Sequence, residues 1–115
     1  METIDFFIHD STIIQVIENT ENNTIDFILD YPVDWDNNVF EKKILRFHDC
    51  LNYMIKEIPF ATQPVILDFK DYGEINYQIG AGLNQMNIKR RKIKLGTSAG
   101  TRTIEYSSIE LLDFE

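Results

Sequence analysis

The sequence contains few of the residues that build disulfide, metal or membrane proteins. A single cysteine among 115 residues, Cys50, excludes an internal disulfide. No apolar run approaches the roughly 20 residues that a membrane-spanning helix needs. The first residues, Met1–Asp5, lack the basic and then apolar segments of a signal peptide. We therefore expect a cytoplasmic protein that does not contact membranes.

Sequence motifs of common enzymes are also missing. The glycine-rich segment Gly96–Gly100 does not end in the Gly-Lys-Ser/Thr of a phosphate-binding loop. Gly80–Gly82 is too short for a dinucleotide-binding motif, and no Gly-x-Ser-x-Gly nucleophile motif occurs. We therefore expect no cofactor, no catalytic residue and no enzymatic activity.

Positive charge is scarce relative to negative charge. The chain has 19 acidic and 11 basic residues, which gives a net charge of −8. Such a balance repels nucleic acid over most of the surface, favours solubility and attracts basic molecules. We expect no nucleic-acid partner, and a basic protein is the partner class that the charge favours.

Alternation of apolar and polar residues with a period of two is the dominant positive signal. This pattern places every second side chain on one face of a β-strand. It predicts a single domain over residues 1–115 of mainly β structure, an antiparallel sandwich or curled sheet of about seven to nine short strands with at most one short helix. The alternating sets are Ile25, Phe27, Leu29 and Tyr31; Val65, Leu67 and Phe69; Ile75, Tyr77 and Ile79; and Arg102, Ile104 and Tyr106, in which an arginine joins the buried face.

Turn residues separate these runs. Glu21-Asn22-Asn23 predicts a hairpin turn, because asparagine tolerates positive φ, and Gly96–Gly100 predicts another. Residues 49–58 fit both a helix and a strand, and we favour a strand because one alternation continues from Arg46 to Tyr53. Ser107–Glu110 matches a helix-capping box, but too few residues follow for a stable helix.

Two His-Asp pairs are the main candidates for chemistry. His9-Asp10 and His48-Asp49 each combine a base with a carboxylate that can orient it, and Cys50 follows the second pair. Neighbouring residues on a strand point to opposite faces, however, which disfavours a shared metal ion. We expect surface or turn residues and no metal site. A metal-dependent enzyme or small-ligand-binding domain that uses His9 and His48 is the alternative.

The most interesting candidate for partner binding is Asp34-Trp35-Asp36. Its alternating oxygens begin like a calcium-binding loop, but Val39 and Leu45 occupy the positions that require glycine and glutamate. Tryptophan is a frequent interface anchor, and acidic neighbours suit a basic partner. Trp35 packed on the core is the alternative.

One run of basic residues interrupts the acidic chain. Lys89–Lys92 precedes an alternating segment, and we expect it to protect an exposed strand edge. Self-association of an accessory domain through exposed edges and this run is a further possibility for function.

Five segments follow one another along the chain in a recognisable order: His9-Asp10-Ser11, Ile44–Asp49, Glu57–Phe60, Thr97–Ile104 and Ile109–Leu112. In these segments the chain resembles a loose group of small bacterial all-β proteins of unknown function. The resemblance implies one all-β domain and no functional residues, and some such proteins are thought to be immunity proteins that neutralise toxins. Together with the negative charge, the resemblance favours a non-enzymatic acidic protein that binds a basic toxin.

Overall fold

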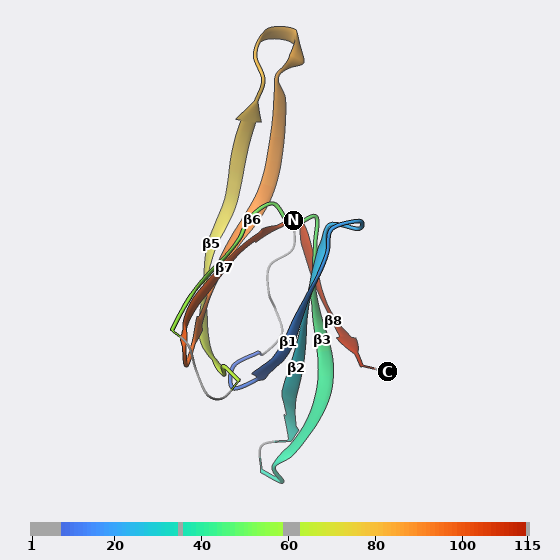
Figure 1. The fold of residues 1–115 in the computed structure, drawn as a ribbon, viewed down its shortest axis with the longest axis vertical. Coiled ribbons are helices and arrows are strands. Elements are labelled where there is room, and N and C mark those ends of the chain that lie inside the picture. Colours follow the sequence, from blue (N-terminus) through green and yellow to red (C-terminus); the bar gives the residue numbers. More distant parts are fainter. Residues whose placement is uncertain (1–7, 35, 59–62, 115) are drawn as a thin grey trace.

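Two four-stranded antiparallel sheets face each other across a shared core in the computed structural model, which describes residues 8–34, 36–58 and 63–114 (Figure 1). Sheet A has the strand order β1-β2-β3-β8, and sheet B has the order β4-β7-β6-β5. The predicted antiparallel β-sandwich is thus confirmed. Its elements are β1 (Thr12–Asn19), β2 (Thr24–Asp34), β3 (Val39–His48), β4 (Tyr53–Glu57), β5 (Ile66–Ile79), the 3₁₀ helix η1 (Gly82–Asn84), β6 (Met86–Thr97), β7 (Gly100–Tyr106) and β8 (Ser108–Asp113).

The predicted hairpin between β1 and β2 is present, and asparagines shape its turn. Asn23 adopts a φ of 57°, a left-handed conformation that asparagine tolerates better than most residues. The Asn19 side chain accepts hydrogen bonds from the backbone N–H groups of Glu21 and Asn22, both at 3.1 Å. Asn19 then pairs with Thr24, so the turn fixes the register of both strands.

The chain changes sheets after β3. Asp49 has a φ of 52°, β3 ends at His48, and the next strand, β4, pairs with β7 of sheet B. The predicted strand in residues 49–58 is therefore present only as Tyr53–Glu57. The expected alternation from Arg46 to Tyr53 is wrong, because the turn at Asp49 sends the chain to the opposite sheet.

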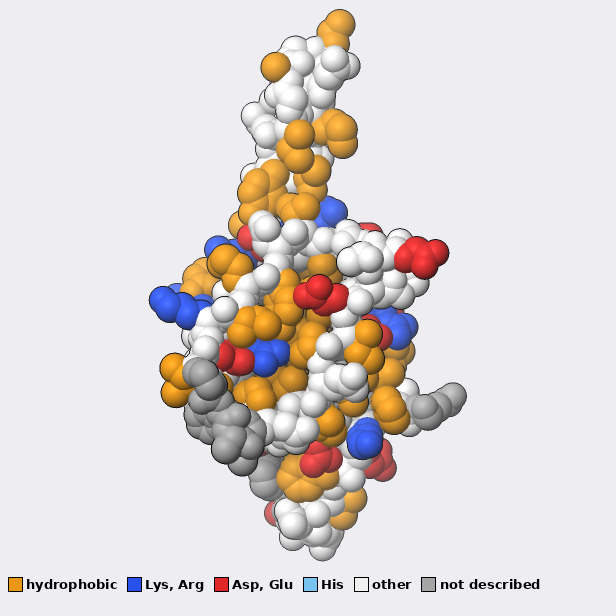
Figure 2. Space-filling model, in the orientation of Figure 1, with side chains coloured by type: hydrophobic (Ala, Val, Ile, Leu, Met, Phe, Trp, Pro, Cys, Tyr) orange, Lys and Arg blue, Asp and Glu red, His pale blue; other side chains and the backbone are white. Residues whose placement is uncertain are grey.

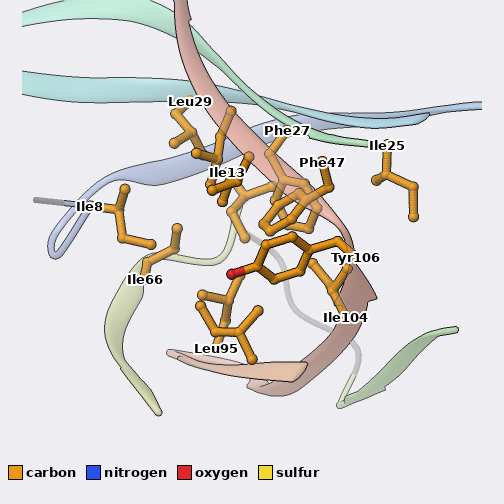
Figure 3. Close-up of a cluster of buried hydrophobic side chains, with 13 residues drawn as sticks. Ile8, Ile13, Ile25, Phe27, Leu29, Phe47, Ile66, Leu95, Ile104 and Tyr106 are labelled. Atoms are coloured by element: carbon orange, nitrogen blue, oxygen red, sulfur yellow. The ribbon is translucent and has the colours of Figure 1, made fainter. Parts of the chain in front are cut away.

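Aromatic side chains fill the space between the sheets (Figure 3). Phe47 makes edge-to-face contacts with Phe27 and Tyr106, with ring centroids 5.6 and 5.1 Å apart. Such pairs add about 0.5–1.5 kcal/mol to the free energy gained by burying their area. Aliphatic side chains from both sheets surround them, and these are Ile8, Ile13, Ile25, Leu29, Leu45, Ile66, Ile93, Leu95, Ile104 and Ile109.

An ion pair lies between the sheets beside this core. Arg102 is only 8% exposed, and it donates two hydrogen bonds to Glu57, from Nε at 2.8 Å and from Nη2 at 2.7 Å. Its Nη1 donates to the Tyr53 hydroxyl, and Thr97 donates to Glu57. The hydrogen bonds from Arg102 lower the pKa of Glu57, and those same bonds raise the pKa of Arg102. The expected arginine on the buried face is tolerated because its charge is fully paired.

Strand β5 differs most from its prediction. Register shifts between Ile66 and Asp68 and between Asp71 and Gly73 mark two bulges. Ile66 is buried, whereas Leu67 and Phe69 are 44% and 39% exposed. The predicted buried set Val65, Leu67 and Phe69 is therefore wrong, because an extra residue in a bulge interrupts the alternation.

The β5–β6 hairpin projects beyond the rest of the molecule (Figure 1). Pairing of β6 with β7 ends at Arg91 and Tyr106, but pairing of β6 with β5 continues to Met86 and Ile79. We call residues 74–91, the part beyond this point, the arm. The arm accounts for the elongated shape of 58 × 29 × 26 Å. In the described part of the chain, no helix is long and apolar enough to cross a membrane.

Candidate functional site

The two predicted His-Asp pairs lie at opposite ends of sheet A. Thr12, just after His9-Asp10, pairs with Asp30, whereas His48 pairs with Thr24. These positions are six residues apart along β2, which is about 20 Å of strand. The structure therefore does not bring the pairs together, and the described residues include no group of three or more side chains suited to hold a metal ion.

Each histidine has a carboxylate partner of its own. His9 Nδ1 lies 2.6 Å from Asp10 Oδ2 on the surface. His48 contacts Glu110 of β8 instead of Asp49, and Asp49 accepts a hydrogen bond from the Ser107 hydroxyl at 2.7 Å. His9 and Asp10 thus form a pair on the surface, as predicted, whereas His48 does not pair with Asp49. The contact between His48 and Glu110 helps to attach β8 to β3.

Cys50 is a half-buried thiol. Its Sγ lies 3.4 Å from the Phe47 carbonyl oxygen, to which it donates. Burial raises its pKa to about 11, so the thiol stays protonated and weakly nucleophilic at neutral pH. It lines a pocket of about 250 Å³ between the β1–β2 turn and the segment before β4, together with Asn23, Ile25 and Tyr53.

Two of the predicted partner-binding residues, Asp34 and Asp36, lie at the end of β2 and in the turn that follows it, away from the arm. Asp34 accepts hydrogen bonds from the Asn37 side chain at 2.7 Å and from its backbone N–H at 3.2 Å, and these lower the pKa of Asp34. Asp36 is exposed, and Trp35 lies outside the described residues. The turn therefore displays negative charge, and the choice between interface and core for Trp35 stays a prediction.

The arm has one apolar face. Its register pairs Tyr77 with Ile88 and Ile79 with Met86, directly opposite each other on the two strands. The alternate pairs, Asn76 with Lys89 and Gln78 with Asn87, point to the other face and are polar. The arm is therefore an amphipathic two-stranded ribbon.

Solvent reaches much of this apolar face. Ile79 is 51% exposed, Met86 is 59% exposed, and Leu83 at the tip is completely exposed. Figure 2 shows hydrophobic side chains along the projecting hairpin up to its end. Six of the fourteen exposed large hydrophobic residues described in the structure belong to the β5–β6 hairpin. Because single exposed residues are ordinary but a continuous row is not, the arm is the strongest candidate binding surface.

A polar contact fixes the base of the arm against the body. The Tyr77 hydroxyl donates to Glu105 of β7 at 2.7 Å, and Asn52 donates to the same carboxylate at 2.8 Å. Arg90 Nε donates to the Asp49 carbonyl oxygen at 2.7 Å. These contacts place the apolar face of the arm on the face of sheet B opposite the core, because Glu105 alternates with the core residues Ile104 and Tyr106. They cover Glu105, which is only 6% exposed.

Basic side chains follow the apolar row toward the body. Lys92 and Lys70 lie 5.6 and 5.0 Å from the centre of the Tyr72 ring, which is the range of cation–π contacts. Strand β6 lies between β5 and β7 from Arg91 onward. The expectation that Lys89–Lys92 protects a strand edge is therefore wrong for the body, where Lys92 is in a central strand.

Charge is distributed unequally between the two sheets. Sheet A with its turns, residues 12–48 and 108–113, holds nine acidic and three basic residues, a net charge of −6. The strands of sheet B with the arm, residues 53–57 and 66–106, hold five acidic and eight basic residues, a net charge of +3. Although the net charge of the whole chain is −8, sheet A with its turns is acidic and sheet B with the arm is basic.

Sequence reasoning did not identify the arm, although its signal was present. The alternation Ile75, Tyr77 and Ile79 continues after Gly80–Gly82 in Met86 and Ile88. This is the pattern of a hairpin with one apolar face, and nothing in it tells whether that face meets a core. Comparison with models of known protein families and with curated proteins gave no significant match.

Proposed function

We propose that the protein is a non-enzymatic binding protein whose arm contacts another protein. The observation that supports this most directly is the exposed apolar row on the arm, with Leu83 at its tip. Polar residues are the usual choice for a solvent-exposed turn, because a leucine side chain stabilises a protein only when it is buried. Covered by a partner, the same side chains would become buried anchors at the centre of an interface.

The shape of the arm supports the same function. The long axis of the molecule is at least twice either of the other two, and beyond Arg91 the two strands of the arm pair only with each other. A two-stranded ribbon is only marginally stable alone in water, and contacts at its base hold this one in place. Such a projection can reach a partner surface that the two sheets do not touch.

A pull-down with matched variants tests this proposal. Tagged wild-type protein, Ile79→Thr/Met86→Thr and the control Val33→Thr/Val39→Thr are compared as baits in native lysate, with quantitative mass spectrometry. Val33 and Val39 are 42% and 43% exposed at the other end of the molecule, so the control removes similar apolar surface. We expect a protein retained by the wild type and the valine variant and lost from the arm variant. Equal capture by all three baits would falsify the role of the arm.

The acidic side supports a second candidate, a basic partner such as a toxin that an immunity protein neutralises. Sheet A and its turns carry six acidic residues that form no ion pair with a described residue. They would accelerate encounter with a basic protein in a salt-dependent way. These residues are Glu18, Glu21, Asp30, Asp34, Asp36 and Glu41.

The same pull-down distinguishes the two candidates when a charge variant is added. Asp34→Asn/Asp36→Asn removes two negative charges from the β2–β3 turn. A basic protein that is lost from this bait and released by high salt, but kept by the arm variant, supports the second candidate. A partner that is indifferent to salt and to these two aspartates contradicts it.

A further inference from the structure

The apolar face of the arm continues onto the outer face of sheet B, which is the face opposite the core. In β6, Ile93 and Leu95 point to the core, so the residues that alternate with them point outward. The bulges between β5 and β6 add residues only to β5, so the alternation along β6 is unbroken from the body to the arm. The outward residues of β6 are Met86, Ile88, Arg90, Lys92, Lys94 and Gly96.

Lysines dominate the part of this surface that lies on the body. Register places Lys70 of β5 directly opposite Lys94 of β6, and Lys92 follows two residues away on the same face. Lys56 of β4 also points outward, because it pairs with Thr101, which alternates with the core-facing residues of β7. None of these four lysines forms an ion pair with a described residue, and together we call them the lysine face.

Acidic side chains on the same surface do not neutralise the lysine face. Two carboxylates point outward from the described strands of sheet B, those of Asp68 and Glu105. Glu105 is only 6% exposed, because Tyr77 and Asn52 donate hydrogen bonds to it and cover it. With Arg90 of the arm, the outward side chains comprise five basic and two acidic residues, a net charge of +3. A molecule that approaches this surface therefore meets mainly positive charge.

The arrangement of the lysines opposes the stability of the sheet. Like charges directly opposite each other on neighbouring strands are destabilising, and Lys70 and Lys94 have this relation. Tyr72, the extra residue of the second bulge in β5, places its ring 5.0 and 5.6 Å from the ammonium groups of Lys70 and Lys92. A negatively charged group beside these lysines would relieve the repulsion. There is room for one in a hollow of about 580 Å³, whose lining includes Asp68, Lys70, Tyr72, Lys94, Gly96 and Thr101.

We propose that the partner of the arm is an acidic protein, which covers the apolar row of the arm and the lysine face in one continuous interface. This inference rests on the proposed function, in which the arm is the binding element. Apolar side chains of the partner would bury Ile79, Met86 and Ile88, and its carboxylates would pair with the lysine face. Such a partner is opposite in charge to the basic protein considered for sheet A.

The length of the surface defines the segment that can cover it. Met86 and Gly96 are the first and last outward residues of β6, and they are ten residues apart. This separation corresponds to roughly 33 Å of strand. An extended segment of about 12 residues therefore spans the whole surface, with apolar residues over the arm and acidic residues over the lysine face.

Other anionic occupants match the surface less well. Nucleic acid offers a uniform row of phosphates and no apolar side chains for the arm, and the net charge of −8 repels it elsewhere on the molecule. A bilayer would leave the backbone edges of the two-stranded arm without hydrogen-bond partners. In addition, Gln78 and Asn87 lie near the tip of the arm and point away from its apolar face. An acidic protein is the occupant that matches both the charge and the apolar row.

Fluorescence anisotropy with a defined probe tests the proposal on the full chain. The probe is a labelled synthetic peptide of about 12 residues, with leucines in one half and glutamates in the other. We expect the wild type to bind it at low salt, and to bind a matched peptide with lysines in place of the glutamates at least about tenfold more weakly. Lys70→Glu/Lys94→Glu should weaken binding of the acidic peptide by about tenfold, and Ile79→Thr/Met86→Thr should weaken it as well.

A matched control and a single variant separate binding from folding. Lys42→Glu/Lys89→Glu changes the net charge by the same amount on other faces, so it should bind like the wild type. Lys70→Glu alone places a carboxylate opposite Lys94, so it should melt no lower than the wild type while binding more weakly. The inference is overturned if the wild type does not bind the acidic peptide, if the two double charge variants bind it equally, or if the arm variant binds it like the wild type.

Three further measurements distinguish other occupants. Labelled oligothymidine, or vesicles of phosphatidylserine and phosphatidylcholine, bound more tightly than the acidic peptide would overturn the choice of a protein, and weaker binding of both supports it. Self-association in sedimentation velocity that Lys70→Glu/Lys94→Glu abolishes would identify a second copy instead. In native lysate, a protein that is lost from the arm variant but captured equally by both double charge variants overturns this inference and leaves the proposed function intact.

Discussion

The same hairpin, β5–β6, is partly buried in the body and partly exposed in the arm. In the body, Ile93 and Leu95 of β6 are 1% and 0% exposed. In the arm, Ile79 and Met86 are more than half exposed. Met86 and Ile88 point to the face of β6 opposite to Ile93 and Leu95, so the apolar alternation changes face across the basic run Lys89–Lys92. The comparison shows that a pattern with a period of two determines which side chains share a face. It does not determine whether another part of the chain covers that face.

The largest expected effect of a substitution is in the aromatic centre of the body. Phe47→Ala removes a completely buried ring that contacts Phe27 and Tyr106. We expect the free energy of unfolding to fall by about 3–5 kcal/mol, because a cavity remains. Urea denaturation measures this change. Ile104→Val, with an expected loss of about 0.5–1.5 kcal/mol, serves if the first variant does not fold. A loss below that of Ile104→Val would contradict the assignment of Phe47 to the centre of the core.

A somewhat smaller loss is expected at the ion pair between the sheets. Arg102→Met leaves Glu57 buried without its partner, and removal of one member of a buried pair typically costs about 3–5 kcal/mol. The added methionine contacts offset part of this cost. Arg46→Met is the matched control, since the Arg46–Asp26 pair lies on the outer face of sheet A with side chains 33% and 16% exposed, and we expect a smaller loss than for Arg102→Met. Equal losses in the two variants would show that the position of the pair between the sheets has no effect.

The same pair predicts a dependence of stability on pH. The pKa of Glu57 is lower in the folded state than the ordinary glutamate value of 4.5, because Arg102 donates hydrogen bonds to the carboxylate. The folded state therefore gains stability from ionised Glu57 above pH 4.5, and this gain is lost as the pH falls through the lower folded pKa. The stability difference between wild type and Glu57→Gln should be constant at neutral pH and shrink in acid. Urea denaturation at a series of pH values measures it, and a difference that grows in acid would refute the assignment.

The smallest expected effect on stability is in the arm. Ile79→Thr/Met86→Thr replaces exposed side chains with a residue that favours strands. We expect each substitution to change the free energy of unfolding by no more than about 0.5 kcal/mol. Thermal melting under conditions where the protein is monomeric checks this. A loss of several kcal/mol would mean that the arm packs on the body.

Much of the fold followed from local signals in the sequence. The turn asparagines and the clean alternation of Ile25, Phe27 and Leu29 predicted the β1–β2 hairpin, since both depend on neighbours along the chain. The bulge at Leu67 and the change of sheet at Asp49 were not predictable in this way. A bulge adds one residue without any composition of its own, and a positive φ at aspartate is permitted in many turns that do not change sheets.

The candidate site was less predictable than the fold. The predicted partners of both histidines were their sequence neighbours. His9 does contact Asp10, but His48 contacts Glu110, which lies 62 residues later in the chain. Prediction of the arm requires knowing where β7 ends. Pairing of β6 with β7 stops at Arg91, and the residues of the β5–β6 hairpin beyond that point have no third strand beside them. The exposure of such a surface depends on how far the neighbouring strands extend, and the sequence of the surface segment alone does not contain this information.

The pairing of β8 with β3 has a consequence for the order in which the protein folds during synthesis. Lys43 pairs with Asp113, so the last strand of sheet A is translated only after all of sheet B. Until then, one edge of β3 has unpaired backbone groups, which can recruit strands of other chains. Pairing between such distant residues also slows folding, because a large loop must close first. Nascent chains that have not yet reached β8 should therefore be the species most prone to aggregate and most dependent on chaperones.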